Sequence, residues 1–165
     1  QSGYLRRLKA TPLTQFEFLS AQVLSRLIVT LTASLIVFVG THLILDYKMV
    51  GSALLLLLVA LLGGLAMITL GLAIACRTES KEFADGLLNA VTFPMLLLSE
   101  VWFSLDGSPV WVQTVAACLP LTHVLEAARA VMLDNAGIPE IWPSLLILVG
   151  FCAAGMTLSI RLFKW

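Results

Sequence analysis

Charged side chains are scarce in this chain. Only 12% of its 165 residues are charged and 59% are hydrophobic, whereas soluble domains carry about 25% charged residues. The ten basic and ten acidic residues cancel, so no net charge recruits nucleic acid. With a mean hydropathy of +0.98, most of the chain is expected to lie in lipid.

The signatures of several catalytic classes are missing as well. No GxxxxGK(S/T) loop is present, so the chain is not expected to bind ATP. HExxH and GxSxG are absent too, which leaves no support for an intramembrane protease or lipase. The cysteines at 76, 118 and 152 form no CxxC pair, and His42 and His123 have no ligand pattern around them. We therefore expect no metal and no cofactor bound by this chain.

What the sequence has instead is a long apolar run. The 27 residues from Val50 to Cys76 contain no charged side chain. As a helix this run would be about 40 Å long, and about 20 apolar residues suffice to cross the roughly 30 Å hydrocarbon core of a bilayer. A soluble helix of that length would show a polar face. The run therefore predicts a transmembrane helix.

Three further spans are expected around it. The predicted fold class is an all-α integral membrane protein with four transmembrane helices plus an outer re-entrant helical hairpin. The hairpin is placed at about 109–133 because Leu119-Pro120 divides it into halves too short to cross. Such a backbone is tolerated at membrane depth only when it is buried in protein or faces water. The expected spans are about 27–45, 50–76, 83–105 and 141–160.

The basic residues are sorted along the chain and predict its orientation. Cytoplasmic segments of membrane proteins are enriched in lysine and arginine. Seven such residues fall at the two ends of the chain and in the loop after the second span, and the opposite side is mainly acidic. Both ends are therefore expected to be cytoplasmic, with the hairpin entering from outside. The seven are Arg6, Arg7, Lys9, Arg77, Lys81, Arg161 and Lys164.

Polar and small residues form stripes within the spans. The first long helix carries Gln22, Arg26, Thr30, Ser34 and Thr41 at helical spacing. This stripe indicates either a polar path or subunit interface, or ordinary hydrogen bonding between helices. Glu17 and Arg26 are expected to lie in the part of this helix that emerges from the membrane. Small residues at Ala60, Gly64, Gly71 and Ala75, and at Gly150, Ala154, Gly155 and Ser159, predict close helix packing.

A second polar group belongs to the third span and the hairpin. Asn89, Thr92 and Glu100 share one side of the third span. A carboxylate at mid-bilayer would cost about 2.5–3.5 kcal/mol, so Glu100 is expected at the outer headgroup level. His123, Glu126 and Arg129 repeat at intervals of three and form one helix face, on which Glu126 and Arg129 can pair. This face either closes the outer end of a pathway or faces the headgroups.

The order of these features resembles a known family. The carrying segments are LRRLKATPLTQFEFLSAQVL (Leu5 to Leu24), TLGLAIACRTES (Thr69 to Ser80) and the hairpin with its Leu-Pro-Leu-Thr-His (residues 96–133). Together they resemble the C-terminal part of the membrane subunit of ATP-binding-cassette type-2 exporters, spans three to six. The resemblance implies a cytoplasmic coupling segment at 1–18 and a transmembrane domain at 19–165. The residues that it places at the ATPase contact are Arg6, Arg7, Lys9, Thr11, Pro12 and Glu17.

The resemblance implies a permease that forms half of a translocation pathway in the bacterial inner membrane, with membrane lipids around it. Its expected partners are a second permease copy and an ATPase subunit that holds ATP and magnesium. Two alternatives stay open. One is a membrane-embedded enzyme or assembly subunit using Glu100, His123 and Glu126, and the other is a passive channel, which the unbroken apolar second span disfavours. The expected pathway or gate residues are Thr30, Ser34, Asn89, Thr92, Glu100, His123, Glu126 and Arg129.

Overall fold

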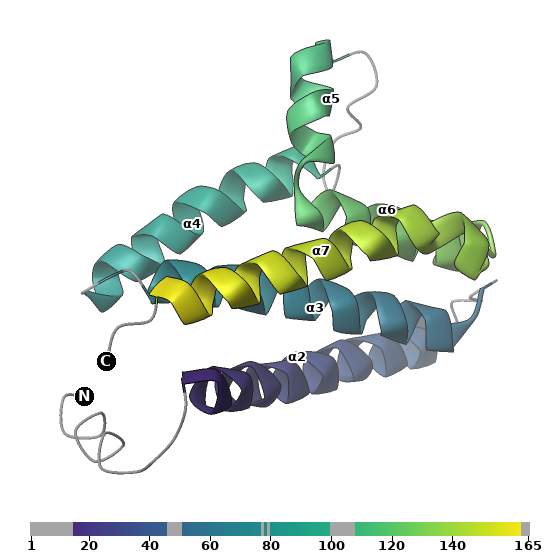
Figure 1. Cartoon of the computed structure of the whole chain (residues 1–165). Coiled ribbons are helices and arrows are strands. Elements are labelled where there is room, and N and C mark those ends of the chain that lie inside the picture. Colours follow the sequence, from purple (N-terminus) through teal and green to yellow (C-terminus); the bar gives the residue numbers. More distant parts are fainter. Residues whose placement is uncertain (1–14, 46–50, 77, 79, 100–107, 163–165) are drawn as a thin grey trace.

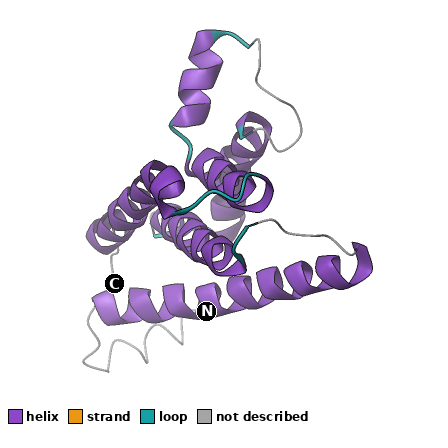
Figure 2. Ribbon diagram, turned by 90° about the vertical axis from the view of Figure 1, so that its right-hand side faces the viewer, coloured by secondary structure: helices purple, strands orange, loops and turns teal. Residues whose placement is uncertain are grey.

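The structure, a computed structural model, describes residues 15–45, 51–76, 78, 80–99 and 108–162. Within these residues every regular element is a helix (Figures 1 and 2). The helices are α2 (Gln15–Leu45), α3 (Ala53–Ala75), α4 (Lys81–Leu98), α5 (Val110–Ala117), α6 (Pro120–Leu133) and α7 (Ile138–Leu162).

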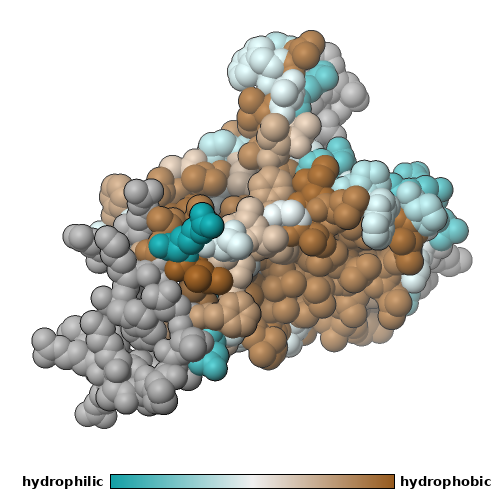
Figure 3. Space-filling model, viewed as in Figure 1, coloured by the Kyte–Doolittle hydropathy of each residue, from teal (hydrophilic) through white to brown (hydrophobic). Residues whose placement is uncertain are grey.

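Three of the helices are long and apolar enough to cross a membrane. Among the described residues they cover Phe16–Ile44, Ala53–Ala75 and Ile138–Leu162, and there a fourth crossing is reached only if the bent pair α5–α6 counts as one span. The space-filling view shows a broad hydrophobic surface over this bundle (Figure 3). The predicted class, an all-α membrane protein, is confirmed. The first of these helices includes Arg26, which lies before the expected span of 27–45.

Helix α4 is shorter and more polar at its start. Its 18 residues extend about 27 Å, and Lys81, Glu82 and Asp85 fall within its first five residues. The Ser80 side chain caps it by accepting a hydrogen bond from the Phe83 N–H at 3.2 Å. The expected third span, 83–105, continues into residues 100–107, which lie outside the described part of the chain, so this span stays a prediction.

The core is built on α3 and α7, which run in the same direction. The Cys152 thiol donates to the Leu62 carbonyl at 3.6 Å, and the Ser159 hydroxyl donates to the Thr69 carbonyl at 3.4 Å. Both contacts join residues 90 positions apart. Because this offset stays the same at two places along the pair, the two helices are parallel. Gly155 lies between them, and a Cβ atom there would be 2.7 Å from Thr69 Oγ1. The glycine therefore lets the two helices approach closely.

The parallel pair constrains how the rest of the chain runs. Because α3 and α7 share a direction, the end of α3 and the start of α7 lie at opposite ends of the bundle. The chain between them must therefore traverse the length of the bundle once. The expected third span would supply this crossing and leave α5–α6 as a hairpin. Helix α2 runs against α3, since Leu27 lies beside Gly64 whereas Phe38 lines a cavity with Leu56. As a result, α2 begins and α7 ends at the same end of the bundle (Figure 1).

Helix α6 packs against α3 and α7 around a cluster of buried hydrophobic residues. Gly63 of α3 approaches Val124 of α6 so closely that a Cβ at Gly63 would lie 2.6 Å from a methyl carbon of Val124. The corner into α7 uses Asn135 at φ 54°, and the Ala136 N–H donates back to the Ala130 carbonyl at 3.0 Å. The buried members of the cluster are Val59, Ala127, Val131, Ala136, Ile141 and Leu145.

Candidate functional site

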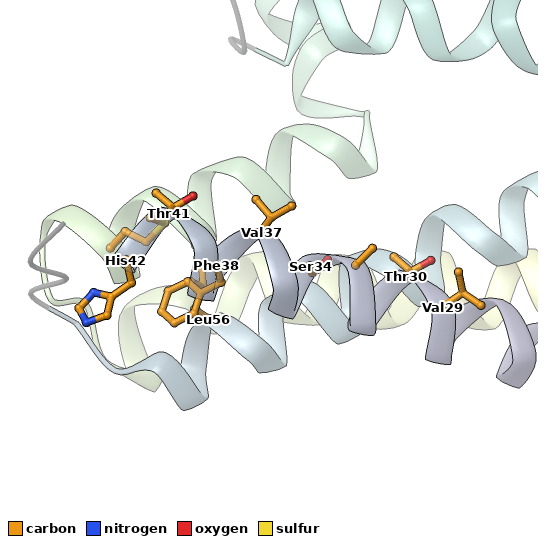
Figure 4. Close-up of a pocket in the computed structure, with 10 residues that line it drawn as sticks. Val29, Thr30, Ser34, Val37, Phe38, Thr41, His42 and Leu56 are labelled. Carbon is orange, nitrogen blue, oxygen red and sulfur yellow. The ribbon is translucent and has the colours of Figure 1, made fainter. Parts of the chain in front are cut away.

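One face of α2 borders a cavity instead of packing against a neighbouring helix. Thr30, Ser34 and Thr41 line a cavity of about 640 Å³, and the close-up shows their side chains in a row along the helix (Figure 4). His42 and Met132 also contribute to its wall. Each hydroxyl lies one or two turns from the next, so the predicted polar stripe follows this face.

A second cavity continues the first toward the beginning of α2. Its volume is about 510 Å³, it shares Thr30 and Ser34 with the first, and it adds Arg26. Residues of α3, α4 and α6 form the remaining walls. The Thr30 hydroxyl donates to the Arg26 carbonyl at 2.9 Å, so its oxygen remains able to accept a hydrogen bond. We call the two cavities together the α2 groove. One of its walls carries the polar stripe of α2, and its other walls are apolar.

The other candidate feature is the bend between α5 and α6. The two helices meet at 84° around Leu119, with Pro120 as the first residue of α6. Proline suits that position because its missing N–H is not needed there. The buried His123 donates from Nε2 to the carbonyl of Ala117, the last residue of α5, at 2.9 Å. A carbonyl only accepts, so Nε2 carries a hydrogen, and an otherwise orphaned helix-end carbonyl is satisfied.

Glu126 lies next to this contact. Its carboxylate is 3.4 Å from His123 Nδ1, and its side chain is 60% exposed. Nδ1 makes no hydrogen bond of good geometry within the described residues, so the contact is an ion pair only when the ring is protonated. The structure thus places the His123 ring beside Glu126, whereas the sequence predicts that Glu126 can pair with Arg129. Arg129 is exposed on the same helix.

The remaining predicted site residues are spread more widely. Asn89 is exposed and Thr92 half-buried on α4. Glu17 lies in the first turn of α2, where its carbonyl accepts from the Ser20 hydroxyl at 3.0 Å. The predicted residues are thus divided between the α2 groove, α4 and the α5–α6 bend. Those outside the described residues are Arg6, Arg7, Lys9, Thr11, Pro12 and Glu100.

Arg26 lines the α2 groove, although the sequence does not predict it there. The sequence predicts Arg26 in the polar stripe, but in the part of the helix that emerges from the membrane and not among the pathway residues. The structure places it on the wall of the second cavity. The available signal was its register, because Arg26 lies four residues before Thr30 and eight before Ser34 on one helix face.

Apolar helices of membrane-spanning length around a polar-striped groove define a multi-pass helical membrane protein. A sequence comparison gives the family. The family model described as ABC-2 type transporter matches residues 1–133, so the chain belongs to the ABC-2 type transporter family. The match includes α2, the α2 groove and the α5–α6 bend.

Curated permeases are similar to this chain, two of them over nearly its whole length and a third over two thirds of it. The inner membrane transport permease YhhJ of Escherichia coli K12 is 27% identical over 99% of this chain and 44% of its own length. The probable multidrug ABC transporter permease YbhR of the same strain is 25% identical over 99% of this chain and 45% of its own. The daunorubicin resistance ABC transporter permease protein DrrB1 of Streptomyces coeruleorubidus is 25% identical over 66% of this chain and 38% of its own.

The chain therefore spans less than half the length of these relatives. No solved structure matches it.

Proposed function

We propose that this chain is part of the permease subunit of an ATP-driven exporter and forms half of its translocation pathway. The observation that carries the proposal is the family match across residues 1–133. Relatives named as a transport permease and a multidrug transporter permease support it. The α2 groove supports it as well, because it offers hydroxyl groups from Thr30 to Thr41 on one face of a helix long enough to cross a membrane.

ATP hydrolysis then belongs to a separate subunit. The sequence has no phosphate-binding loop, so ATP and magnesium are held by an ATPase partner. Two permease copies would face each other in the inner membrane, with the ATPases on the cytoplasmic side. The coupling segment predicted at residues 1–18 includes the start of α2, which begins at Gln15, so a push on this part of α2 would reach the α2 groove through one continuous helix.

A catalytic use of the bend is less well supported. The enzyme alternative needs reactive side chains that are free to meet a substrate. In the described residues the His123 Nε2 hydrogen is already donated to Ala117, and Nδ1 faces Glu126. This arrangement ties two helices together, which fits a structural joint in a transporter.

Reversing the charges of Arg6 and Arg7 tests the coupling role. The double substitution Arg6→Glu, Arg7→Glu should abolish ATP-driven transport in vesicles that contain permease and ATPase, because arginine pairs with carboxylates at interfaces. Membrane insertion should be unchanged. Arg161→Glu, an exposed arginine in the last turn of α7, is the matched control and should keep transport. Wild-type coupling in the double variant would refute the assignment.

Cysteine labelling tests the topology. In a variant without the three native cysteines, Glu82→Cys and Asp134→Cys should react with a membrane-impermeant maleimide from opposite sides of the membrane. Both positions are exposed; one lies at the start of α4 and the other at the end of α6. The physical reason is that α3 and α7 are parallel, so the chain between them has to cross from one side of the membrane to the other. If both cysteines react from the same side, the third span and the hairpin are misassigned.

A further inference from the structure

Arg26 lies near the middle of the membrane-spanning part of the bundle. Its neighbour Leu27 and the residue one turn on, Thr30, would each be 3.7 Å from a Cβ at Gly64. Gly64 has eleven residues of α3 on either side, because the helix covers Ala53–Ala75. The guanidinium is therefore attached within about one turn of mid-span. An arginine at this depth is expensive unless it is paired or reaches water.

No group of the protein neutralises this charge within the described residues. There the Arg26 side chain makes no hydrogen bond and no ion pair, and it is exposed on the wall of the 510 Å³ cavity. Asp85 of α4 lies one turn before Leu88, which borders the same cavity, but it forms no ion pair with Arg26 in the structure. Among the described residues that line it, the cavity thus contains one unpaired cation, Arg26.

Apart from the hydroxyls of Thr30 and Ser34, the rest of the cavity is lined by apolar residues. Gly64 and Gly71 of α3 form part of its floor, and Leu88 of α4 and Leu121 of α6 form part of its sides. A Cβ at Gly64 or Gly71 would be in ordinary contact at 3.7 Å, so no neighbouring side chain occupies the space above either glycine. Ligand cavities of about 300–1,000 Å³ with apolar walls and a few polar groups are typical of small-molecule sites.

We propose that this cavity is a binding site for a membrane-soluble amphipathic anion, with Arg26 as its counter-ion. A carboxylate or phosphate would pair with the guanidinium in the two-pronged geometry that arginine favours. The apolar body would lie over Gly64 and Gly71. A single-chain or ring-bearing anion fits a cavity of about 510 Å³ better than a two-chain phospholipid, which would bring a second acyl chain into the same space.

The hydroxyls of Thr30 and Ser34 extend the site along α2 into the larger cavity. An anion released from Arg26 would meet these hydrogen-bonding groups next. That this anion is the exported cargo rests on the proposed function. Binding itself does not, because it requires neither ATP nor an ATPase.

A photoaffinity experiment tests the site. The protein in phosphatidylcholine nanodiscs is exposed to palmitic acid that carries a mid-chain diazirine, and separately to the methyl ester of the same probe. The acid should label α2 and α3 residues of the cavity. Arg26→Gln should lower acid labelling about tenfold or more, as the loss of a charged pair predicts, and should leave ester labelling unchanged. Arg26→Lys should retain part of the acid labelling.

Two controls separate binding from folding. Arg161→Gln removes an exposed arginine elsewhere and should have no effect. Gly64→Leu should fill the cavity and block both probes. Equal labelling of wild type and Arg26→Gln by the acid would overturn the proposal. So would an absence of acid labelling in the wild type, the result expected if another membrane helix fills the groove. Failure here with intact coupled transport would leave the exporter assignment standing.

Discussion

Replacing Gly155 with leucine is expected to destabilise the protein by about 3 kcal/mol or more, the upper end of what overpacking costs in a tight core. Even a Cβ at this position would lie 2.7 Å from Thr69 Oγ1, 2.9 Å from Thr69 Cβ and 3.0 Å from the Thr69 carbonyl carbon. Backbone cannot move aside as a flexible side chain does. The two central helices would have to separate and would lose the Ser159–Thr69 contact of 3.4 Å.

Gly150 supplies the matched control on the same helix. A Cβ there would meet nothing within 4 Å, so Gly150→Leu should be tolerated, apart from the small helix-propensity difference. The measurement is unfolding of each purified variant in mixed micelles by increasing mole fraction of sodium dodecyl sulfate, followed by circular dichroism. Equal midpoints for the two leucine variants would show that α3 and α7 do not pack closely at Gly155.

The sequence was informative about the elements of the fold. The charge-free run at Val50 to Cys76 predicted a helix that the structure places at Ala53–Ala75. The break at Leu119-Pro120 was also predictable, because proline is favoured at the first position of a helix and disfavoured in its interior. Length, charge and proline act locally, so they can be interpreted without knowing what packs where.

The packing faces were less predictable. Gly64 and Gly71 were expected on a closely packed face, yet the close approach in α3 occurs at Gly63, against Val124 of α6. One residue along a helix turns the side chain by about 100°. An apolar helix without a polar face gives no signal of its rotation, so small residues alone could not show which neighbour each would meet.

The candidate site shows the same limit. The stripe with Thr30 and Ser34 was predictable from spacing, because it needs only one helix. The depth of Arg26 needed the contact of Leu27 with Gly64, which joins two helices. The Ala117–His123 hydrogen bond likewise crosses a bend of 84°, and the sequence interval of six residues gave no hint of it.

That hydrogen bond leads to the second large expected effect. His123→Ala should loosen the joint between α5 and α6, because it leaves the Ala117 carbonyl without its partner. The hydrogen bond is partly buried and Ala117 itself is exposed, so its loss should cost about 0.5–1.5 kcal/mol, the usual net contribution of one hydrogen bond. Spin labels at Thr114 and Leu133, both exposed, report the angle between the two helices. In a variant without native cysteines, their distance distribution should broaden markedly in His123→Ala and stay narrow in the parent.

Two further variants distinguish the hydrogen bond from the ion pair. His123→Gln places an amide N–H near the Nε2 position and should restore the narrow distribution. Glu126→Gln removes the carboxylate 3.4 Å from Nδ1, but with 60% of that side chain exposed the loss should be small. If Glu126→Gln broadens the distribution as much as His123→Ala, the ion pair holds the bend instead.

Export measured on the same variants connects the joint to the pathway. If α5 and α6 move as one rigid corner to close the outer end, export should fall in His123→Ala and recover in His123→Gln, while the amount of folded protein stays similar. Arg129→Ala, on the exposed face of the same helix, should reduce export without broadening the distance distribution, because it leaves the Ala117 contact intact. Export that follows only the amount of folded protein in all four variants would mean that the bend is structural and that gating lies elsewhere.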